Sequence, residues 1–302
     1  MADTAARLLG AIEAGGTKFE CAVATDPDAI LASQRFPTTT PDETFAQVLE
    51  FFDACQSRHG TLDAFGIGSF GPLQLDPVSP SYGRILASPK AGWGGFDLTA
   101  PLCRRYARPV VLDTDVNAAA LAEWHQRAAQ NIRSLVYVTV GTGIGGGAVI
   151  DGRPVHGLGH PEMGHIRVQR HAQDLSFAGV CPFHHDCLEG LASGPAIVAR
   201  WGAPMSALRN NDVACNVVGS YLGQLAATIT LLLSPHRIVF GGGVMSAGVL
   251  LPSVRHYARE SLAGYLSHAL LQGELEEFIT APALGDRAGI IGAIRLASTA
   301  RS

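Results

Sequence analysis

The 302-residue sequence contains almost no lysine. Of its 22 basic residues only Lys18 and Lys90 are lysines, so arginine supplies nearly all of the positive charge. A lysine carries a compact, point-like charge, whereas the guanidinium of arginine is planar and delocalised. A lysine that persists against such a bias indicates a position where a compact charge is needed, and chance is the alternative interpretation.

The sequence also lacks a strong charge of either sign and a long apolar run. Its formal net charge is −4 and only 16% of its residues are charged, which does not favour nucleic acid or an anionic membrane as a partner. No apolar run reaches the ~18 to 20 residues of a membrane-spanning helix. The first residues lack the positive charge and long apolar stretch of a signal peptide. We therefore expect a soluble, cytoplasmic protein.

Cysteine is sparse, and most of it is scattered. Cys21, Cys55, Cys103 and Cys215 lie far apart in apolar or helical contexts, which is typical of reduced, buried cysteines in an intracellular protein. Apolar residues make up 47% of the chain, enough for the core of one large domain or of two ordinary ones.

A strand, a glycine turn and a second strand occur twice. Residues 8–13 and 19–25 read as strands joined by AGGTK, and residues 134–141 and 148–152 flank a second glycine-rich turn. Helical and strand patterns follow both copies. We interpret this as an internal duplication with about 120 residues between the copies, which predicts an α/β fold with two mixed sheets and helices packed on them. A cleft between two such halves is a natural ligand site.

Three glycine turns follow predicted strands: EAGGTK at 13–18, GTGIGGG at 141–147 and GGGVM at 241–245. Glycine lets the backbone approach a ligand and point N–H groups at it, and the first turn adds a hydroxyl and an ammonium group, which is phosphate-binding chemistry. None of the three is a Walker loop or a GxGxxG dinucleotide turn. A plain tight turn explains each one alone, but together they favour a nucleotide lying across the cleft.

Two carboxylates lie at the end of the strand predicted at 109–115. They are Asp113 and Asp115, and Asn117 follows at the start of a predicted helix. A carboxylate at the carboxyl end of a strand can take a proton from a hydroxyl that attacks phosphorus. Asp115 can equally serve as the N-cap of the helix, so both interpretations stay open from the residues alone.

The run CPFHHDC, residues 181–187, combines thiols and imidazoles. Cys181, His184 and Cys187 are ligand types that Zn²⁺ prefers in a tetrahedral site, and His165 is the best candidate for the fourth ligand. The histidines that compete with these are His160, His171 and His185. Two cysteines favour a closed, structural site over a hydrolytic zinc, which keeps an open position for water.

Glu162 lies three residues before His165. A zinc ion that holds this loop also fixes where Glu162 and the free side of the His165 ring point, so that both can bind the hydroxyls of a sugar. In this interpretation the metal is structural and the carboxylate across the cleft carries out the chemistry. A zinc hydrolase is the alternative.

Taken together, the motifs resemble the ROK family (repressors, open reading frames and kinases) of bacterial sugar kinases, in family order and over essentially the whole chain. The segments that carry the resemblance are EAGGTK, DTDVNAAALAE, VTVGTGIGGG, HPEMGH, CPFHHDCLEGLASGPAI, IVFGGGVM and GDRAGIIGAIRLA. The CPxHxDCLEG form, HPEMGH and the EAGGTK start are similar to the fructokinase branch. The resemblance implies two actin-like (ribonuclease-H-like) α/β domains hinged around a central cleft. We place them at residues 1–116 and 117–284, with 285–302 a terminal helix that returns to the first domain.

The resemblance also implies phosphate transfer from ATP to D-fructose, with Mg²⁺. Asp115 matches the catalytic base of the family, and Glu162 and His165 match its sugar-binding pair. His165 is then also a zinc ligand, with Cys181, His184 and Cys187. The residues predicted to bind ATP are Gly15, Gly16, Thr17, Lys18, Thr142, Gly143, Pro195, Gly241, Gly242, Gly243, Val244 and Met245. A homodimer is common in the family.

Two departures from the family pattern bear on the site. Glu13 stands where most members have Asp, and Thr114 stands where most hexose-specific members have Asn. We expect Thr114 to contact the sugar and Lys90 to lie at the sugar mouth. A kinase for mannose, glucose or an amino sugar is the main alternative, because one missing contact shifts preference by only about 1 to 3 kcal/mol. A sugar-sensing regulator needs a DNA-binding extension before Glu13, where the sequence has twelve residues.

Overall fold

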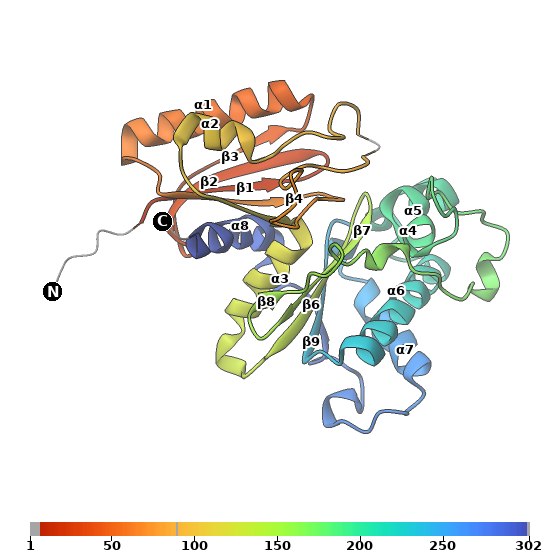
Figure 1. Ribbon diagram of the computed structural model, residues 1–302. Coiled ribbons are helices and arrows are strands. Elements are labelled where there is room, and N and C mark those ends of the chain that lie inside the picture. The colour runs from red at the N-terminus through yellow and green to blue at the C-terminus, as the bar shows by residue number, and fades with distance from the viewer. Residues whose placement is uncertain (1–6, 89, 301–302) are drawn as a thin grey trace. The chain divides into compact units, whose positions relative to one another are not determined.

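The computed structural model describes residues 7–88 and 90–300, which form two compact α/β units (Figure 1). Unit 1 contains the described residues up to Ala122, the segment Pro154–His160 and the described residues from Arg287 onward. Unit 2 contains Glu123–Arg153 and Pro161–Asp286. Each unit is built on its own five-stranded sheet.

The sheet of unit 1 has the order β3-β2-β1-β4-β5. Strand β1 pairs antiparallel with β2, and β1, β4 and β5 run parallel. Helices cover both faces of this sheet, with α1 and α2 on one side and α8 on the other (Figure 1), which is why β1 and β4 are buried almost throughout. The elements are β1 (Leu9–Ala14), β2 (Lys18–Asp26), β3 (Ala29–Pro37), α1 (Pro41–His59), β4 (Ala64–Ser69), α2 (Ala100–Tyr106), β5 (Val110–Thr114), α3 (Asp115–Gln126) and α8 (Ala288–Thr299).

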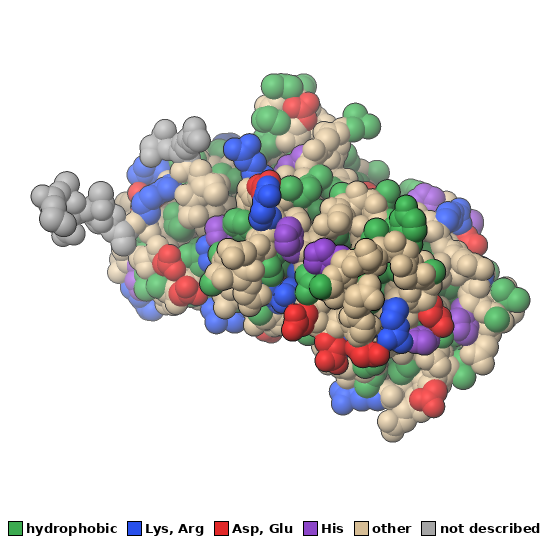
Figure 2. Space-filling view, turned by 90° about the horizontal axis from the view of Figure 1, so that it is seen from below, with side chains coloured by type: hydrophobic (Ala, Val, Ile, Leu, Met, Phe, Trp, Pro, Cys, Tyr) green, Lys and Arg blue, Asp and Glu red, His purple; other side chains and the backbone are tan. Residues whose placement is uncertain are grey.

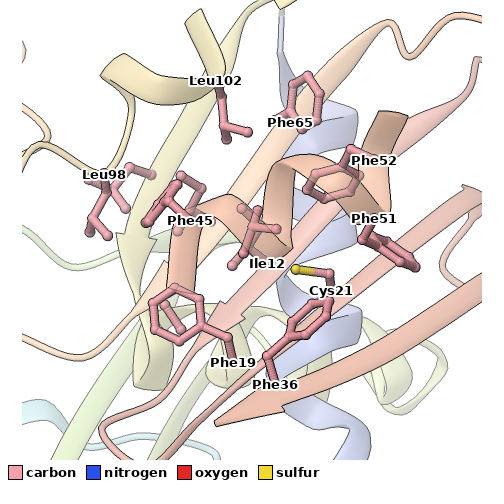
Figure 3. Close-up of a cluster of buried hydrophobic side chains, with 14 of the residues drawn as sticks. Ile12, Phe19, Cys21, Phe36, Phe45, Phe51, Phe52, Phe65, Leu98 and Leu102 are labelled. Atoms are coloured by element: carbon pink, nitrogen blue, oxygen red, sulfur yellow. The ribbon is translucent and has the colours of Figure 1, made fainter. Parts of the chain in front are cut away.

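An aromatic cluster fills the space between α1 and the sheet of unit 1 (Figure 3). The ring of Phe52 on α1 lies edge-on to the ring of Phe65 on β4, with centroids 5.1 Å apart. Phe19 on β2 meets Phe45 on α1 in the same way at 6.1 Å. Such edge-to-face pairs add to the stabilisation that burial provides. Helix α1 itself begins where TPDE predicts, because the Thr40 side chain caps the backbone N–H of Glu43.

The terminal helix α8 packs against β1 and β4 on the opposite face. Gly66 of β4 permits this close approach, because a Cβ there would overlap the carbonyl oxygen of Ala293. Gly292 of α8 is similarly pressed against the backbone of Ala118 in α3. Helix α8 therefore completes the core of unit 1.

The sheet of unit 2 repeats the scheme of unit 1 with the order β10-β9-β6-β7-β8. Strand β6 pairs antiparallel with β7 and parallel with β9, and β9 runs parallel to β10. The predicted duplication is therefore present in the strand pairing. The elements are β6 (Ser134–Val140), β7 (Ile144–Ile150), β8 (Arg153–Pro154), α4 (Leu188–Ala192), α5 (Gly194–Trp201), α6 (Asp212–Leu233), β9 (Arg237–Gly241), α7 (Leu250–Leu262) and β10 (Ile279–Thr280).

Helix α6 is the long apolar helix of unit 2. By length and composition it could cross a membrane, with a mean hydropathy of 1.3, but 67% of the apolar window is buried within the protein. It packs closely along α7, where Gly219 and Gly223 leave room for Ser253 and Tyr257. The core of a globular unit explains its apolar composition.

Several predicted boundaries were wrong. Strand β7 begins at Ile144, not 148, so three of the glycines predicted to form the turn lie inside a strand. The helix predicted from Val244 begins at Leu250, because a 3₁₀ turn and Gly248, at φ +76°, precede it. Strand β10 has only two residues.

The predicted domain ranges 1–116, 117–284 and 285–302 stay predictions, but the compact units have different limits. The first division between the units falls inside α3, after Ala122, and the last one follows Asp286. Nothing in the sequence indicated that Pro154–His160, flanked on both sides by unit 2, belongs to unit 1.

Candidate active site and metal centre

The corner where β5 becomes α3 holds the two aspartates and gives them different surroundings. Asp113 is buried and its Oδ1 accepts hydrogen bonds from Thr114 N at 2.7 Å and from Asn117 Nδ2 at 2.8 Å. Asp115 is the first residue of α3 and only half-buried, with its Oδ1 2.9 Å from Val116 N. Asp113 therefore stabilises the internal structure of the corner, and Asp115 is the more exposed of the two carboxylates.

Thr114, predicted to contact the sugar, is buried in this corner. Its hydroxyl oxygen accepts a hydrogen bond from Asn117 N at 3.1 Å and so caps α3. A contact with sugar stays a prediction. His156 also reaches the corner, with its Nε2 3.0 Å from Asp113 Oδ2, and the hydrogen bond with Asp113 raises the pKa of His156. Sequence reasoning missed His156, because no motif or spacing marks it.

Glu13, near the end of β1, is half-buried, and its Oε2 atom is shielded from solvent. Burial, then the charge of Glu20, raises its pKa to about 7, and Asp115 contributes in the same direction. Its Oε2 has no hydrogen-bond partner among the residues that the structure describes. Gly289 of α8 leaves the space for this side chain, because a Cβ there would overlap the carboxyl group.

We expect Glu13→Gln to raise the free energy of unfolding by an amount that increases with pH. Since the pKa rises from 4.5 to about 7 on folding, the folded chain binds the proton more tightly, and the free energy of unfolding falls as the pH rises across that range, by at most about 3 kcal/mol. Urea unfolding in EDTA should show a larger gain from Glu13→Gln at pH 8 than at pH 5. Glu50→Gln, on the exposed side of α1, is the control. Equal effects of Glu13→Gln at the two pH values would contradict this prediction.

The first glycine turn lies in unit 1, between β1 and β2, and is closely braced. Gly15 N donates to Lys18 O at 2.9 Å, and Thr38 Oγ1 donates to Gly15 O at 2.7 Å. Lys90 Nζ donates to Gly16 O at 2.5 Å. Both lysines of the chain therefore lie at one turn. The expected contact of Lys90 with the sugar stays a prediction.

The other two glycine turns converge in unit 2. Gly194 N, at the start of α5, donates to Gly141 O at 2.7 Å, and Val244 N donates to Val140 O at 2.9 Å. Gly242 adopts φ +90°, and a Cβ there would press against Val140. The structure thus brings together the unit 2 residues predicted to bind ATP, which are Thr142, Gly143, Pro195, Gly241, Gly242, Gly243, Val244 and Met245. Sequence reasoning missed Glu189, whose Oε2 accepts from Ile144 N at 2.9 Å.

His165, Cys181, His184 and Cys187 form one compact cluster in unit 2. One ligand atom from each residue lies within 4.8 Å of the other three. Cys181 Sγ is 3.8 Å from Nδ1 of both histidines, and Cys187 Sγ is 3.5 Å from His165 Nδ1. Ligands of a tetrahedral zinc, with bonds of about 2.0 to 2.3 Å, lie about 3.3 to 3.8 Å apart, so the donor atoms fit this metal.

The loop that carries these side chains is tightly folded. Backbone hydrogen bonds run in both directions between Cys181 and His185, at 3.1 and 2.9 Å. A Cβ at Gly190 would overlap the backbone oxygen of His185, so this glycine allows the loop to close. Leu188 N donates to Ile166 O at 2.9 Å and joins the loop to the His165 segment.

The competing histidines lie elsewhere. His160 Nε2 accepts from Leu73 N in unit 1, and His171 Nδ1 accepts from Gln173 N. His185 adopts φ +56° and is outside the cluster.

Burial raises the pKa of the Cys187 thiol to about 11, so a metal that binds there displaces a proton. Glu162 is exposed just before the 3₁₀ turn Met163–His165.

Two duplicated sheets with glycine turns define the chain as a two-domain α/β protein of the actin-like class, as predicted. It matches the model of the ROK family over residues 9–300. The chain belongs to this family, which confirms the resemblance expected from its motifs.

Known proteins of this family align over nearly the whole chain. The chain is 44% identical to a putative fructokinase of Bacillus subtilis (strain 168) over 97% of its length and 96% of that protein. It is also 44% identical to a fructokinase of Zymomonas mobilis subsp. mobilis (strain ATCC 31821 / ZM4 / CP4), with 98% of each chain covered. Among solved structures, a ROK family glucokinase from Streptomyces griseus in complex with glucose and AMPPNP superposes with a TM-score of 0.77 at 26% identity, over 97% of this chain and 100% of that one.

Proposed function

We propose that the protein is an ATP-dependent fructokinase that phosphorylates D-fructose to fructose 6-phosphate. The observation that carries this proposal is the 44% identity, over 97% and 98% of the chain, to two proteins named as fructokinases. The braced glycine turns and the half-buried Asp115 at the β5–α3 corner provide the chemistry that such a reaction needs.

Asp115 acts as the general base. Its carboxylate takes the proton from the 6-hydroxyl of the sugar while that oxygen forms a bond to the γ-phosphorus, and the bond from this phosphorus to the bridging oxygen of ADP breaks. Its partial exposure supports this role, whereas Asp113 is occupied by internal hydrogen bonds.

The glycine turns bind ATP. Backbone N–H groups of the turns, with Lys18 and the hydroxyls of Thr17 and Thr142, hold the phosphates. Mg²⁺ bound with ATP would supply positive charge to the phosphates during transfer. The unpartnered Oε2 of Glu13 is a hard oxygen donor of the kind that Mg²⁺ prefers.

Glu162 and His165 bind hydroxyls of the sugar, and Thr114 and Lys90 add contacts. Zn²⁺ would be held by His165, Cys181, His184 and Cys187, and its role is structural because four protein ligands leave no open position for water. The metal would orient the His165 ring and the adjoining Glu162 segment. A zinc hydrolase would need such an open position.

A coupled ADP-release assay tests the function. We expect turnover with D-fructose to exceed turnover with mannose, glucose and N-acetylated amino sugars. EDTA should stop the reaction at once by removing Mg²⁺, and added Mg²⁺ should restore it. A kcat/KM higher for another hexose would move the assignment to a different sugar kinase, and no turnover with any hexose would favour a regulator.

The remaining parts of the proposal concern a nucleic-acid partner, the oligomeric state and the cellular location. On the face that Figure 2 presents, Lys and Arg side chains lie at separate places among acidic and neutral ones, which gives no support to a nucleic-acid partner. A homodimer and a cytoplasmic location stay predictions. Light scattering of the purified chain measures the first.

A further inference from the structure

His156 contacts the corner that carries Asp115, although its short segment is flanked in the sequence by residues of unit 2. It lies in Pro154–His160, the segment between β8 and the HPEMGH motif that packs within unit 1. His156 Nε2 lies 3.0 Å from Asp113 Oδ2. At the end of the same segment, His160 Nε2 accepts from Leu73 N at 2.9 Å. Two imidazoles therefore attach this segment to unit 1.

The partner of His156 is a buried carboxylate. The side chain of Asp113 is only 5% exposed, whereas that of His156 is 40% exposed. A buried carboxylate is costly unless hydrogen bonds and a nearby positive charge compensate it. Thr114 N and Asn117 Nδ2 supply neutral donors, and a protonated His156 supplies the charge.

Asp113 in turn holds the backbone before Asp115 and the side chain of a residue after it. Its Oδ1 binds Thr114 N, one residue before Asp115, and Asn117 Nδ2, two residues after it. A change in the position of the Asp113 carboxylate therefore shifts the first turn of α3, on which Asp115 lies. Misplacement of a catalytic group by about 1 Å can cost on the order of 100-fold in rate.

We propose that His156 is a positioning residue for phosphate transfer, which holds the β5–α3 corner through Asp113 so that Asp115 faces the substrate. This rests on the proposed role of Asp115 as the base. His156 itself does not touch the reacting atoms. We call the contact between His156 Nε2 and the Asp113 carboxylate the brace. Protonation of His156 strengthens the brace, because the charge of Asp113 is then paired.

The brace has a definite dependence on pH. Asp113 is the ionised partner of His156, Asn117 is a neutral neighbour, and Tyr82 lies near the same carboxylate. The hydrogen bond to Asp113 raises the pKa of His156, so the contribution of this hydrogen bond to stability is present below pH 6.5, the ordinary pKa of histidine. Its contribution is lost as the pH rises through the raised value.

The test compares His156→Ala and His156→Gln with His256→Ala, which removes an exposed histidine from a similar pair with Glu260 on α7. We expect His156→Ala to lower kcat roughly 10-fold or more, with the KM for ATP within about twofold. His156→Gln, whose amide can donate to Asp113, should recover much of the loss. We expect kcat of the wild type to decline above neutral pH, and His156→Gln should lack this decline. His256→Ala should behave as the wild type.

Asp115→Asn, measured in parallel, separates the two proposals. If Asp115→Asn keeps its turnover, the base has been assigned wrongly. If Asp115→Asn is inactive but His156→Ala keeps its kcat within twofold, the positioning role is overturned. If His156→Ala does not fold, the His156→Gln pH profile decides, and a decline unchanged from the wild type overturns the role.

Discussion

Asp115→Asn should lower kcat for fructose phosphorylation by roughly 10² to 10⁴-fold, the contribution of a general base. The amide has nearly the shape of the carboxylate but cannot accept the proton of the attacking hydroxyl. ATP should still bind, because its predicted contacts are made by the glycine turns. Steady-state kinetics and calorimetric titration with a non-hydrolysable ATP analogue measure the two effects.

A carboxylate in a matched position controls for effects on the helix. Asp42 is exposed in the first turn of α1, as Asp115 is the first residue of α3, so Asp42→Asn removes a comparable favourable interaction with a helix N-terminus. We expect it to keep wild-type kcat. Near-normal turnover of Asp115→Asn would show that another group accepts the proton.

Cys187→Ser should abolish stoichiometric zinc binding. It removes one of the four donor atoms from the cluster, and a hydroxyl replaces a thiolate poorly as a zinc ligand. Changes in the surroundings of zinc ligands already cost 10- to 100-fold in metal affinity, so we expect a loss of at least about 100-fold here. Elemental analysis after dialysis gives the metal content.

The loss of zinc should raise the KM for fructose more than the KM for ATP, because the ligand His165 and the adjoining Glu162 are the residues proposed to bind the sugar. Thermal unfolding should begin at a lower temperature. Cys103→Ser, at an exposed free thiol on α2, is the control. If Cys187→Ser bound zinc as tightly as Cys103→Ser does, the ligand set would be wrong.

The strands and glycine turns could be predicted because their signals are local. Alternating and continuous apolar runs, bounded by glycines on at least one side, marked β1, β2, β6 and β9 to within a few residues. The turn at GTGIGGG was predicted too long, because glycine was taken as a sign of a turn. Gly146 lies in strand β7 instead. A glycine is needed at this strand position because a Cβ there would press against Met163.

The remaining features depend on contacts between distant segments. Spacing did not decide between His184 and His185, and the left-handed backbone of His185, hydrogen-bonded to Cys181, places His184 in the cluster. His156 approaches Asp113 from 43 residues away in the chain. No local sequence pattern predicts such a pair. It forms because the segment Pro154–His160 packs within unit 1.

The position of α8 has a consequence for biosynthesis. Strands β1 and β4 are made early, but the helix that covers their second face, with Ala293 against Gly66, comes last. A chain emerging from the ribosome therefore exposes an apolar sheet surface until α8 has been synthesised. Nascent chains stalled before residue 288 should need protection by chaperones, even though all five strands of that sheet have already been synthesised.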